Sequence, residues 1–233
     1  MYGLVRILLT ERKKARPDSI FSVFLLRLLK LINFMQNHLP SFIFVGRSGS
    51  GKGTQAELLI KALKDASPSR DSLYIVTGGE LRELAKQSSL TASIIKNVTE
   101  SGGLMPSFVP IYIWTKVMSD RYTGQEYLVF DGTPRKVLEA RALDDLFPFY
   151  GLGKPWVIYL DVHEDESMKR LKLRGRKDDA HEAIVKRFAW YEADVSPVVS
   201  YYRTNPNVNF IDVNGVDTIE AVHADIVKKT GLK

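Results

Sequence analysis

The chain of 233 residues contains no cysteine. This absence excludes disulfide bonds and every metal site that is built from thiolates. It also suits a reducing compartment, and we expect a cytoplasmic location. Hydrophobic residues make up 45% and charged residues 26% of the chain, so the composition is that of an ordinary globular protein.

Most of the chain also lacks an excess of basic residues, although the formal net charge is +6. Residues 1–40 hold seven basic and two acidic residues, whereas the rest of the chain holds 26 basic and 25 acidic residues. A protein that binds duplex nucleic acid needs a basic stripe on its folded body. Because the body is nearly neutral, we expect no nucleic acid among the partners.

The apolar stretch at residues 19–34 is short for a bilayer span and contains Arg27 and Lys30. It could form a helix that packs on the protein or lies on a membrane surface, and it could be a targeting segment. It could also be absent from the functional protein, because translation could begin at Met35, just ahead of the first predicted strand. We treat residues 1–40 as an N-terminal extension, and membrane contact is the less favoured alternative.

From Ser41 onward, short apolar segments alternate with amphipathic segments. The apolar segments are rich in β-branched and aromatic residues, which is typical of strands buried on both faces of a parallel sheet. The predicted strands are Phe42–Val45, Leu73–Val76, Tyr127–Phe130, Trp156–Leu160 and Val208–Val213. Helices are predicted over about 52–65, 79–87, 91–101, 107–122, 135–147, 164–174, 179–203 and 216–230. This order predicts an α/β domain over residues 41–233, with a doubly wound parallel sheet of about five strands.

A glycine-rich loop, Gly46 to Thr54, joins the first predicted strand to the first predicted helix. Its sequence, GRSGSGKGT, fits the pattern GxxxxGK of P-loop NTPases. Glycines let backbone amides approach phosphate oxygens, and the helix N-terminus adds partial positive charge. We therefore expect a bound nucleoside triphosphate. The predicted binding residues are Gly49, Ser50, Gly51, Lys52, Gly53 and Thr54.

Two oxygen ligands for Mg²⁺ are predicted near this loop. A hydroxyl directly after the lysine normally helps to hold the ion, but Gly53 occupies that place and Thr54 follows it. Asp131 ends a predicted central strand, where a carboxylate can hold Mg²⁺ through water. Asp131 could also cap the next helix ahead of Pro134, and the two roles are compatible. The loop alone does not distinguish a GTPase, a motor ATPase and a small-molecule kinase.

Four segments read in order narrow this choice: GKGTQ at 51–55, TGGELR at 77–82, FDGTPR at 130–135 and RGRKDD at 174–179. Together they resemble the adenylate kinase family of nucleoside monophosphate kinases, over essentially residues 41–233. The resemblance implies direct transfer of the ATP γ-phosphate to AMP, which gives two ADP. It also implies a helical part that binds the nucleoside monophosphate (NMP), at about 77–106, a lid at about 174–179, and a monomer.

The resemblance further implies roles for five arginines, whose planar, permanent charge suits phosphate binding. Arg82 and Arg135 resemble the pair that holds the phosphate of the acceptor. Arg174, which also contacts ATP, and Arg176 resemble the lid arginines, and Arg187 resembles the arginine that touches both substrates. The implied catalytic residues are Lys52, Asp131, Arg135, Arg174, Arg176 and Arg187. The implied acceptor-binding residues are Thr77, Arg82, Gly103, Leu104, Met105, Gly132, Arg135, Glu139, Arg176 and Arg187.

The sequence departs from the family pattern at several positions. Only Gly175 separates the two lid arginines, and without cysteine the zinc site of some long lids is excluded. Gly79 replaces an aspartate of the Mg²⁺–water network, and Thr133 replaces an aromatic residue. Glu139 stands where the family has a glutamine that contacts the base. A carboxylate only accepts hydrogen bonds, so donors on adenine, cytosine or guanine could all bind it.

These departures leave alternatives open. AMP is the favoured acceptor, and UMP, CMP or GMP is the first alternative. A second alternative is a non-catalytic nucleotide-binding regulatory protein of the same fold. A third, which depends only on residues 19–34, is a membrane-tethered ATP-binding module. The Asp178–Asp179 pair resembles the residues that anchor the family's lid, although Asp179 could simply cap the following helix.

Overall fold

The structure, a computed structural model, describes residues 39–176 and 179–232. These residues belong to one compact unit, Leu39–Lys233. The predicted apolar segment at 19–34 lies outside the described residues, and so do residues 177 and 178 of the predicted lid. Among the helices that the structure describes, none has the length and apolar character needed to cross a membrane.

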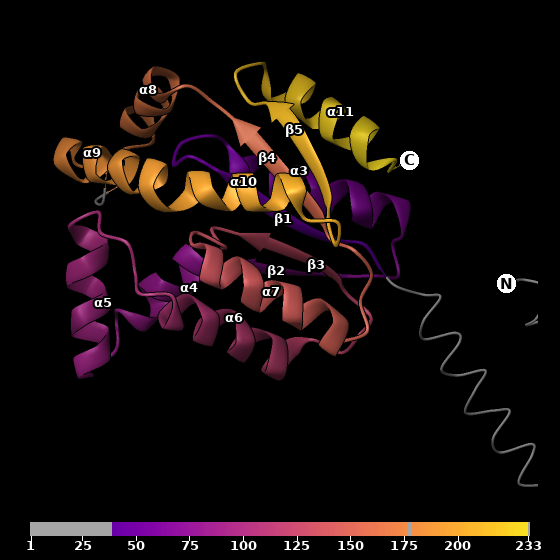
Figure 1. The fold of residues 1–233 in the computed structure, drawn as a ribbon, viewed down its shortest axis with the longest axis horizontal. Coiled ribbons are helices and arrows are strands. Elements are labelled where there is room, and N and C mark those ends of the chain that lie inside the picture. The colour runs from indigo at the N-terminus through magenta and orange to yellow at the C-terminus, as the bar shows by residue number, and fades with distance from the viewer. Residues whose placement is uncertain (1–38, 177–178, 233) are drawn as a thin grey trace, which may run out of the picture. The chain divides into compact units, whose positions relative to one another are not determined.

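Five parallel strands form one sheet in the order β2–β3–β1–β4–β5 (Figure 1). The strands are β1 (Ser41–Gly46), β2 (Ser72–Val76), β3 (Tyr127–Asp131), β4 (Trp156–Asp161) and β5 (Asn209–Asn214). β1 pairs with β3 on one side and with β4 on the other, so the chain passes from one half of the sheet to the other across β1. Ligands of open α/β sheets bind beyond the carboxyl ends of the strands at such a point. The predicted doubly wound parallel sheet is confirmed.

Helices connect the strands and cover both faces of the sheet (Figure 1). They are α3 (Lys52–Ala66), α4 (Thr77–Leu84), α5 (Leu90–Glu100), α6 (Phe108–Arg121), α7 (Val137–Phe149), α8 (Glu164–Arg174), α9 (His181–Trp190), α10 (Ser196–Thr204) and α11 (Ile219–Thr230). The prediction of one continuous helix over 179–203 is wrong in one respect. A π-helical segment, η1 (Tyr191–Val195), separates α9 from α10. Apolar periodicity does not reveal such a local widening.

Alternate residues of the central strands enter two hydrophobic cores. Ile43 of β1 packs in the core beneath α6, α7 and α10, whereas Phe42 and Phe44 pack in the core beneath α3 and α11. The outer strands differ from the prediction, because β2 and β5 are not buried on both faces. Each has a neighbouring strand on one side only, and β5 exposes Asp212.

The segment between β2 and β3 has a small core of its own. Leu81 of α4, Ile95 of α5, Met105 and two residues of α6 form this separate cluster. α4 therefore packs against both α5 and α6, and α6 continues along one face of the sheet (Figure 1). The NMP-binding part that the sequence predicts at about 77–106 includes α4 and α5, and its binding role stays a prediction.

Candidate active site

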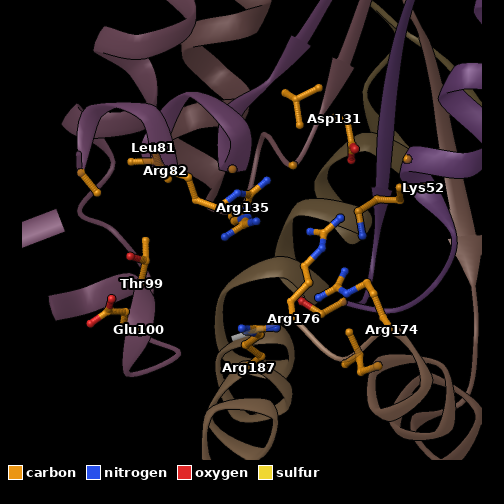
Figure 2. Close-up of a pocket in the computed structure, with 18 of the residues that line it drawn as sticks. Lys52, Leu81, Arg82, Thr99, Glu100, Asp131, Arg135, Arg174, Arg176 and Arg187 are labelled. Carbon is orange, nitrogen blue, oxygen red and sulfur yellow. The ribbon is translucent and has the colours of Figure 1, made fainter. Parts of the chain in front are cut away.

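A cavity of about 1330 Å³ opens beyond the carboxyl ends of the strands. Its wall is formed by the glycine-rich loop, α4, α5, α8, α9 and the end of β3 (Figure 2). Most predicted site residues line it: Gly49, Gly51, Lys52, Gly53, Thr54, Arg82, Gly103, Asp131, Gly132, Arg135, Arg174, Arg176 and Arg187. The other predicted residues, all of them described, lie off this wall: Ser50, Thr77, Leu104, Met105 and Glu139.

The loop owes its shape to glycines in the left-handed region. Gly51 has φ 93° and immediately precedes the first residue of α3, where a side chain would be strained. Gly49 has φ 84°, and a Cβ there would lie 2.7 Å from the carbonyl oxygen of Ser167. The loop therefore packs closely against α8 while the amides at the start of α3 stay available for an anion.

Lys52, the first residue of α3, points across the loop. Its Nζ donates hydrogen bonds to the carbonyl oxygens of Gly46 and Arg47, both at 2.8 Å. Burial lowers the pKa of Lys52 to about 8, with Arg135 and Arg174 adding to the effect and Asp131 opposing it. A bound phosphate group would compensate the lost hydration of the ammonium group and the charges of the two arginines.

Asp131 lies at the carboxyl end of β3, and its carboxylate is held by a residue that the sequence did not single out. Tyr74 of β2 donates a hydrogen bond of 3.2 Å from its hydroxyl to Asp131 Oδ2. Burial raises the pKa of Tyr74, and the charge of Asp131 adds to this. The only signal for Tyr74 was its place near the end of an adjacent predicted strand. A Cβ at Gly53 would lie 3.5 Å from Asp131 Oδ2, so the loop and this carboxylate are close.

Five arginines converge on the middle of the cavity together with Lys52 (Figure 2). Arg82 lies on α4, and Arg135 lies in the loop that follows β3. Burial lowers the pKa of Arg135, and the positive charges of Arg187 and Arg82 contribute in the same direction. Cations brought this close to one another repel, and bound phosphate would compensate them.

One carboxylate, that of Asp179, accepts hydrogen bonds from Arg174, Arg176 and Arg187. Arg174 donates to it from Nε at 2.9 Å and from Nη2 at 2.7 Å, and Arg187 donates from Nη1 at 2.8 Å. The backbone N–H of Arg176 also donates to it at 3.2 Å. Burial alone would raise the pKa of Asp179, but the hydrogen bonds from the two guanidinium groups hold it below its ordinary value. Asp178 lies outside the described residues.

Asp179 does not cap the next helix, so that alternative is wrong. Ala180 is the N-cap of α9, and no side chain caps this end. The carboxylate instead fixes guanidinium groups from the end of α8 and from α9. This bidentate, multiply bonded geometry is the stronger form of ion pair.

Trp190 and Arg170 also line the cavity, although the sequence did not single them out. Trp190 donates from Nε1 to the carbonyl oxygen of Gly102 at 3.0 Å, and its ring lies 5.2 Å from the Arg135 guanidinium carbon. Arg170 donates from Nη1 to the Gly215 carbonyl oxygen at 2.9 Å. Each lies about one helical turn from a predicted arginine, and that spacing was the available signal.

Gly102 allows the segment between α5 and α6 to approach α9. Its φ is 71°, and a Cβ would lie 2.5 Å from the carbonyl oxygen of Ala183. No side chain larger than hydrogen fits there without movement of the backbone. Next to it, Gly103 lines the cavity, whereas the side chain of Met105 is buried in the core with Leu81.

Glu139 lies in α7, and its side chain is almost completely buried. Its Oε2 accepts the backbone N–H of Arg135 at 2.7 Å and the hydroxyl of Thr133 at 3.4 Å. Within the part of the chain that the structure describes, its Oε1 has no hydrogen-bond partner. Burial raises the pKa of Glu139, and the bond from Arg135 opposes the change. Its predicted contact with a base stays a prediction.

The described residues contain no group of three or more His, Asp or Glu side chains that could hold a metal ion. The chain has a P-loop fold, and one cavity is lined by Lys52 together with several arginines. This combination is typical of phosphotransferases that act on nucleotides. Known proteins identify the family within this class. The model of the family described as adenylate kinase matches residues 44–207.

Three relatives show the extent of the similarity. Adenylate kinase 1 of Nostoc sp. is 31% identical over 189 residues, which cover 81% of this chain and 97% of the relative. The adenylate kinase of Azobacteroides pseudotrichonymphae is 33% identical, with coverage of 79% and 93%. That of Prochlorococcus marinus is 29% identical, with coverage of 84% and 99%. The chain belongs to the adenylate kinase family and is a nucleoside monophosphate kinase, as the sequence predicted.

Proposed function

We propose that the chain transfers the γ-phosphoryl group of Mg·ATP to AMP and forms two ADP, using the residues of this cavity. The observation that carries the proposal is that one cavity is lined by Lys52 of the phosphate-binding loop and by six arginines from several elements, five of which are labelled with Lys52 in Figure 2. Two polyanions can meet only where cations compensate both of them. The adenylate kinase relatives support AMP as the acceptor.

The donor nucleotide binds with its phosphates on the loop. The amides at the start of α3 and the glycines of the loop surround the phosphates, and Lys52 moves from the loop carbonyls to the β and γ phosphates. The two carbonyl oxygens hold the ammonium group near this position before ATP arrives. Arg174 approaches from the end of α8.

The acceptor binds on the side of α4 and α5. Arg82 and Arg135 hold its phosphate, and an oxygen of that phosphate attacks the γ-phosphorus in line with the bond to the departing ADP. Arg176 and Arg187 compensate the charge that is shared by attacking and leaving oxygens. Because Asp179 already binds both Arg174 and Arg187, these cations are ordered before substrate arrives.

Mg²⁺ fits the oxygen ligands of the site. Thr54 and Asp131 line the same cavity and supply a hydroxyl and a carboxylate, the ligand types that this ion prefers. With few protein ligands, the ion would keep water and phosphate oxygens, as is usual for Mg²⁺. When bound, Mg²⁺ compensates the phosphate charge of the donor.

A second acceptor is favoured by one observation, the carboxylate of Glu139. Its Oε1 has no hydrogen-bond partner among the described residues but is buried off the cavity wall, so it would have to become accessible to accept a donor such as the amino group of cytosine or the N–H groups of guanine. CMP, GMP or UMP is therefore the alternative acceptor. We further propose that the protein acts as a cytoplasmic monomer, which rests on the family resemblance and on the absence of cysteine.

The test is a coupled assay of the purified full chain with ATP, Mg²⁺ and each NMP in turn. We expect turnover with AMP to exceed that with the other three acceptors. Preference for CMP, GMP or UMP would move the assignment to the alternative. Failure to phosphorylate any NMP, by a protein that still binds ATP, would overturn the enzyme assignment and favour a regulatory protein.

A further inference from the structure

Arg47, the second residue of the glycine-rich loop, has a side chain that turns away from the cavity and is only 12% exposed. Its guanidinium carbon lies 4.2 Å from the ring centre of Tyr191 and 5.3 Å from that of Phe188. Its Nη2 donates to Glu192 at 2.6 Å, and its Nη1 donates to Glu164 at 3.4 Å. A loop side chain is thus enclosed by residues far away in the sequence.

The residues around Arg47 belong to the elements that carry Arg174 and Arg187. Phe188 directly follows Arg187 on α9, and η1 continues this helix with Tyr191. Glu164 is the first residue of α8, the helix that ends at Arg174. The side chain of Arg47 therefore contacts both helices that deliver arginines to the cavity, α8 with Arg174 and α9 with Arg187.

The backbone of Arg47 contacts Lys52, the lysine of the phosphate-binding loop. Its carbonyl oxygen accepts the hydrogen bond of 2.8 Å from Lys52 Nζ. One residue thus contacts the phosphate-binding lysine through its backbone and the arginine-bearing helices through its side chain. The hydroxyl of Tyr191 is itself 3.0 Å from that of Tyr159 on β4, so the aromatic partner is fixed to the sheet.

The aromatic contacts outweigh the ion pairs here. Glu164 and Glu192 have side chains that are 58% and 61% exposed, and ion pairs of exposed carboxylates contribute little. A largely desolvated guanidinium group on aromatic faces is bound more strongly. The planar shape of the group, and not its charge alone, accounts for the contact, so lysine should not replace it.

We propose that Arg47 is a positioning residue that fixes the phosphate-binding loop against α9 and η1, so that Lys52 and Arg187 act on the same phosphoryl group. This proposal rests on the proposed function, because it assigns no chemistry to Arg47 itself. Misplacement of reacting groups by about 1 Å lowers a rate by about 100-fold. Loss of the Arg47 side chain should therefore affect the transfer step more than the binding of either nucleotide.

The test compares Arg47→Ala and Arg47→Lys with Arg203→Ala in the full chain. Arg203 is a matched control, because it also lies over two aromatic rings, at 5.7 and 5.6 Å, and pairs with Asp212, yet it lies off the cavity. Melting temperature, kcat, and KM for ATP and for AMP are measured for each variant. We expect Arg47→Ala to lower kcat by about 10- to 100-fold, with both KM values within about threefold of the wild type.

Arg47→Lys should recover little of the lost kcat, and Arg203→Ala should keep its kcat even where its melting temperature falls. If Arg47→Ala folds poorly, Phe188→Leu replaces it, since this change removes one ring face and keeps apolar bulk. We expect Phe188→Leu to lower kcat and to lose most of its effect in an Arg47→Lys background. Full kcat in a folded Arg47→Ala or Phe188→Leu, or equal losses in Arg203→Ala, would overturn the proposal. A wild-type protein without any turnover would instead overturn the proposed function, and this proposal with it.

Discussion

In the half of the cavity that we propose binds ATP, the donor half, Lys52 is held by the backbone of its own loop, whereas the half that we propose binds AMP, the acceptor half, is assembled from side chains of separate elements. Lys52 is bound by carbonyl oxygens only five and six residues away. On the acceptor side, Arg82 comes from α4, Arg135 follows β3, and Trp190 reaches across from α9 to Gly102. Geometry in the donor half is therefore local, while geometry in the acceptor half depends on how helices pack.

The donor half should therefore tolerate the replacement of side chains better than the acceptor half. A loop shaped by its own glycines and by the start of a helix keeps its internal conformation when a side chain is replaced, although its position against α9 and η1 depends on Arg47. A pocket fixed by contacts between helices responds to changes in any of them.

Lys52→Met tests the donor half and should have the largest effect. The change removes the cation at the β and γ phosphates and leaves a side chain of similar length. We expect kcat to fall by about 1,000-fold, since loss of one charge-stabilising group commonly costs that much. Circular dichroism and the melting temperature should stay near those of the wild type, because the loop is held by its glycines.

Lys61→Met is the control for this change, since Lys61 is exposed on the same helix. It should leave kcat unchanged. A Lys52→Met protein with kcat within tenfold of the wild type would mean that the lysine does not contact the transferring phosphate.

Arg135→Ala tests the acceptor half. It removes a guanidinium group that lies over Trp190 and near Arg82 and Arg187. We expect kcat/KM for AMP to fall by about 100-fold, while the dissociation constant of ATP, measured by calorimetry, changes little. Arg141→Ala, which removes an exposed arginine of α7, is the matched control. An equal loss in ATP affinity would show that the two halves are not separable in this way.

The same comparison explains how much could be predicted from the sequence. The donor loop is one contiguous motif. Six of its residues, Gly49 to Thr54, were predicted to bind the triphosphate, and all of them except Ser50 line the cavity. The strands were found because short apolar runs between glycines and charges have few other uses in a fold of this class. Their predicted ends differ from those of the structure by at most one residue.

The residues that the sequence missed lie where separate elements meet. Tyr74, Arg170 and Trp190 carry no motif, and only the packing of strands and helices brings them to the cavity. For the cluster around Asp179, the sequence predicted the arginines because they fitted a motif. Whether Asp179 caps a helix or pairs with those arginines depends on the three-dimensional structure. The side chain of Met105 packs in the core, and the predicted place of this residue beside the acceptor stays a prediction.

The pH dependence of ATP use tests the donor half by a different route. Burial lowers the pKa of Lys52 to about 8, so the unliganded protein loses this charge as the pH rises through that value. We expect kcat/KM for ATP, which reports the free enzyme, to fall by up to about tenfold per pH unit above that point. Lys52→Arg, which stays charged, should remove this decline even if its activity is low. A wild-type profile that stays flat up to about pH 10 would show that the lysine titrates outside this range.

Glu139→Gln has the smallest expected effect and tests whether the side chain at this position contacts the base of the acceptor. The amide oxygen of glutamine can still accept the N–H of Arg135, so the loop before α7 should keep its shape. If the other end of the side chain meets the base, the new amide group adds a donor, and kcat/KM for AMP should rise by about two- to tenfold over that for CMP or GMP.

Asp145→Asn controls for the loss of a negative charge, since Asp145 is exposed on the same helix. It should leave the preference among acceptors unchanged. If Glu139→Gln leaves that preference unchanged as well, Glu139 acts only on the loop that carries Arg135, through the bond of 2.7 Å. Base recognition must then come from other residues on the acceptor side of the cavity, where Thr99 and Glu100 of α5 line the wall (Figure 2).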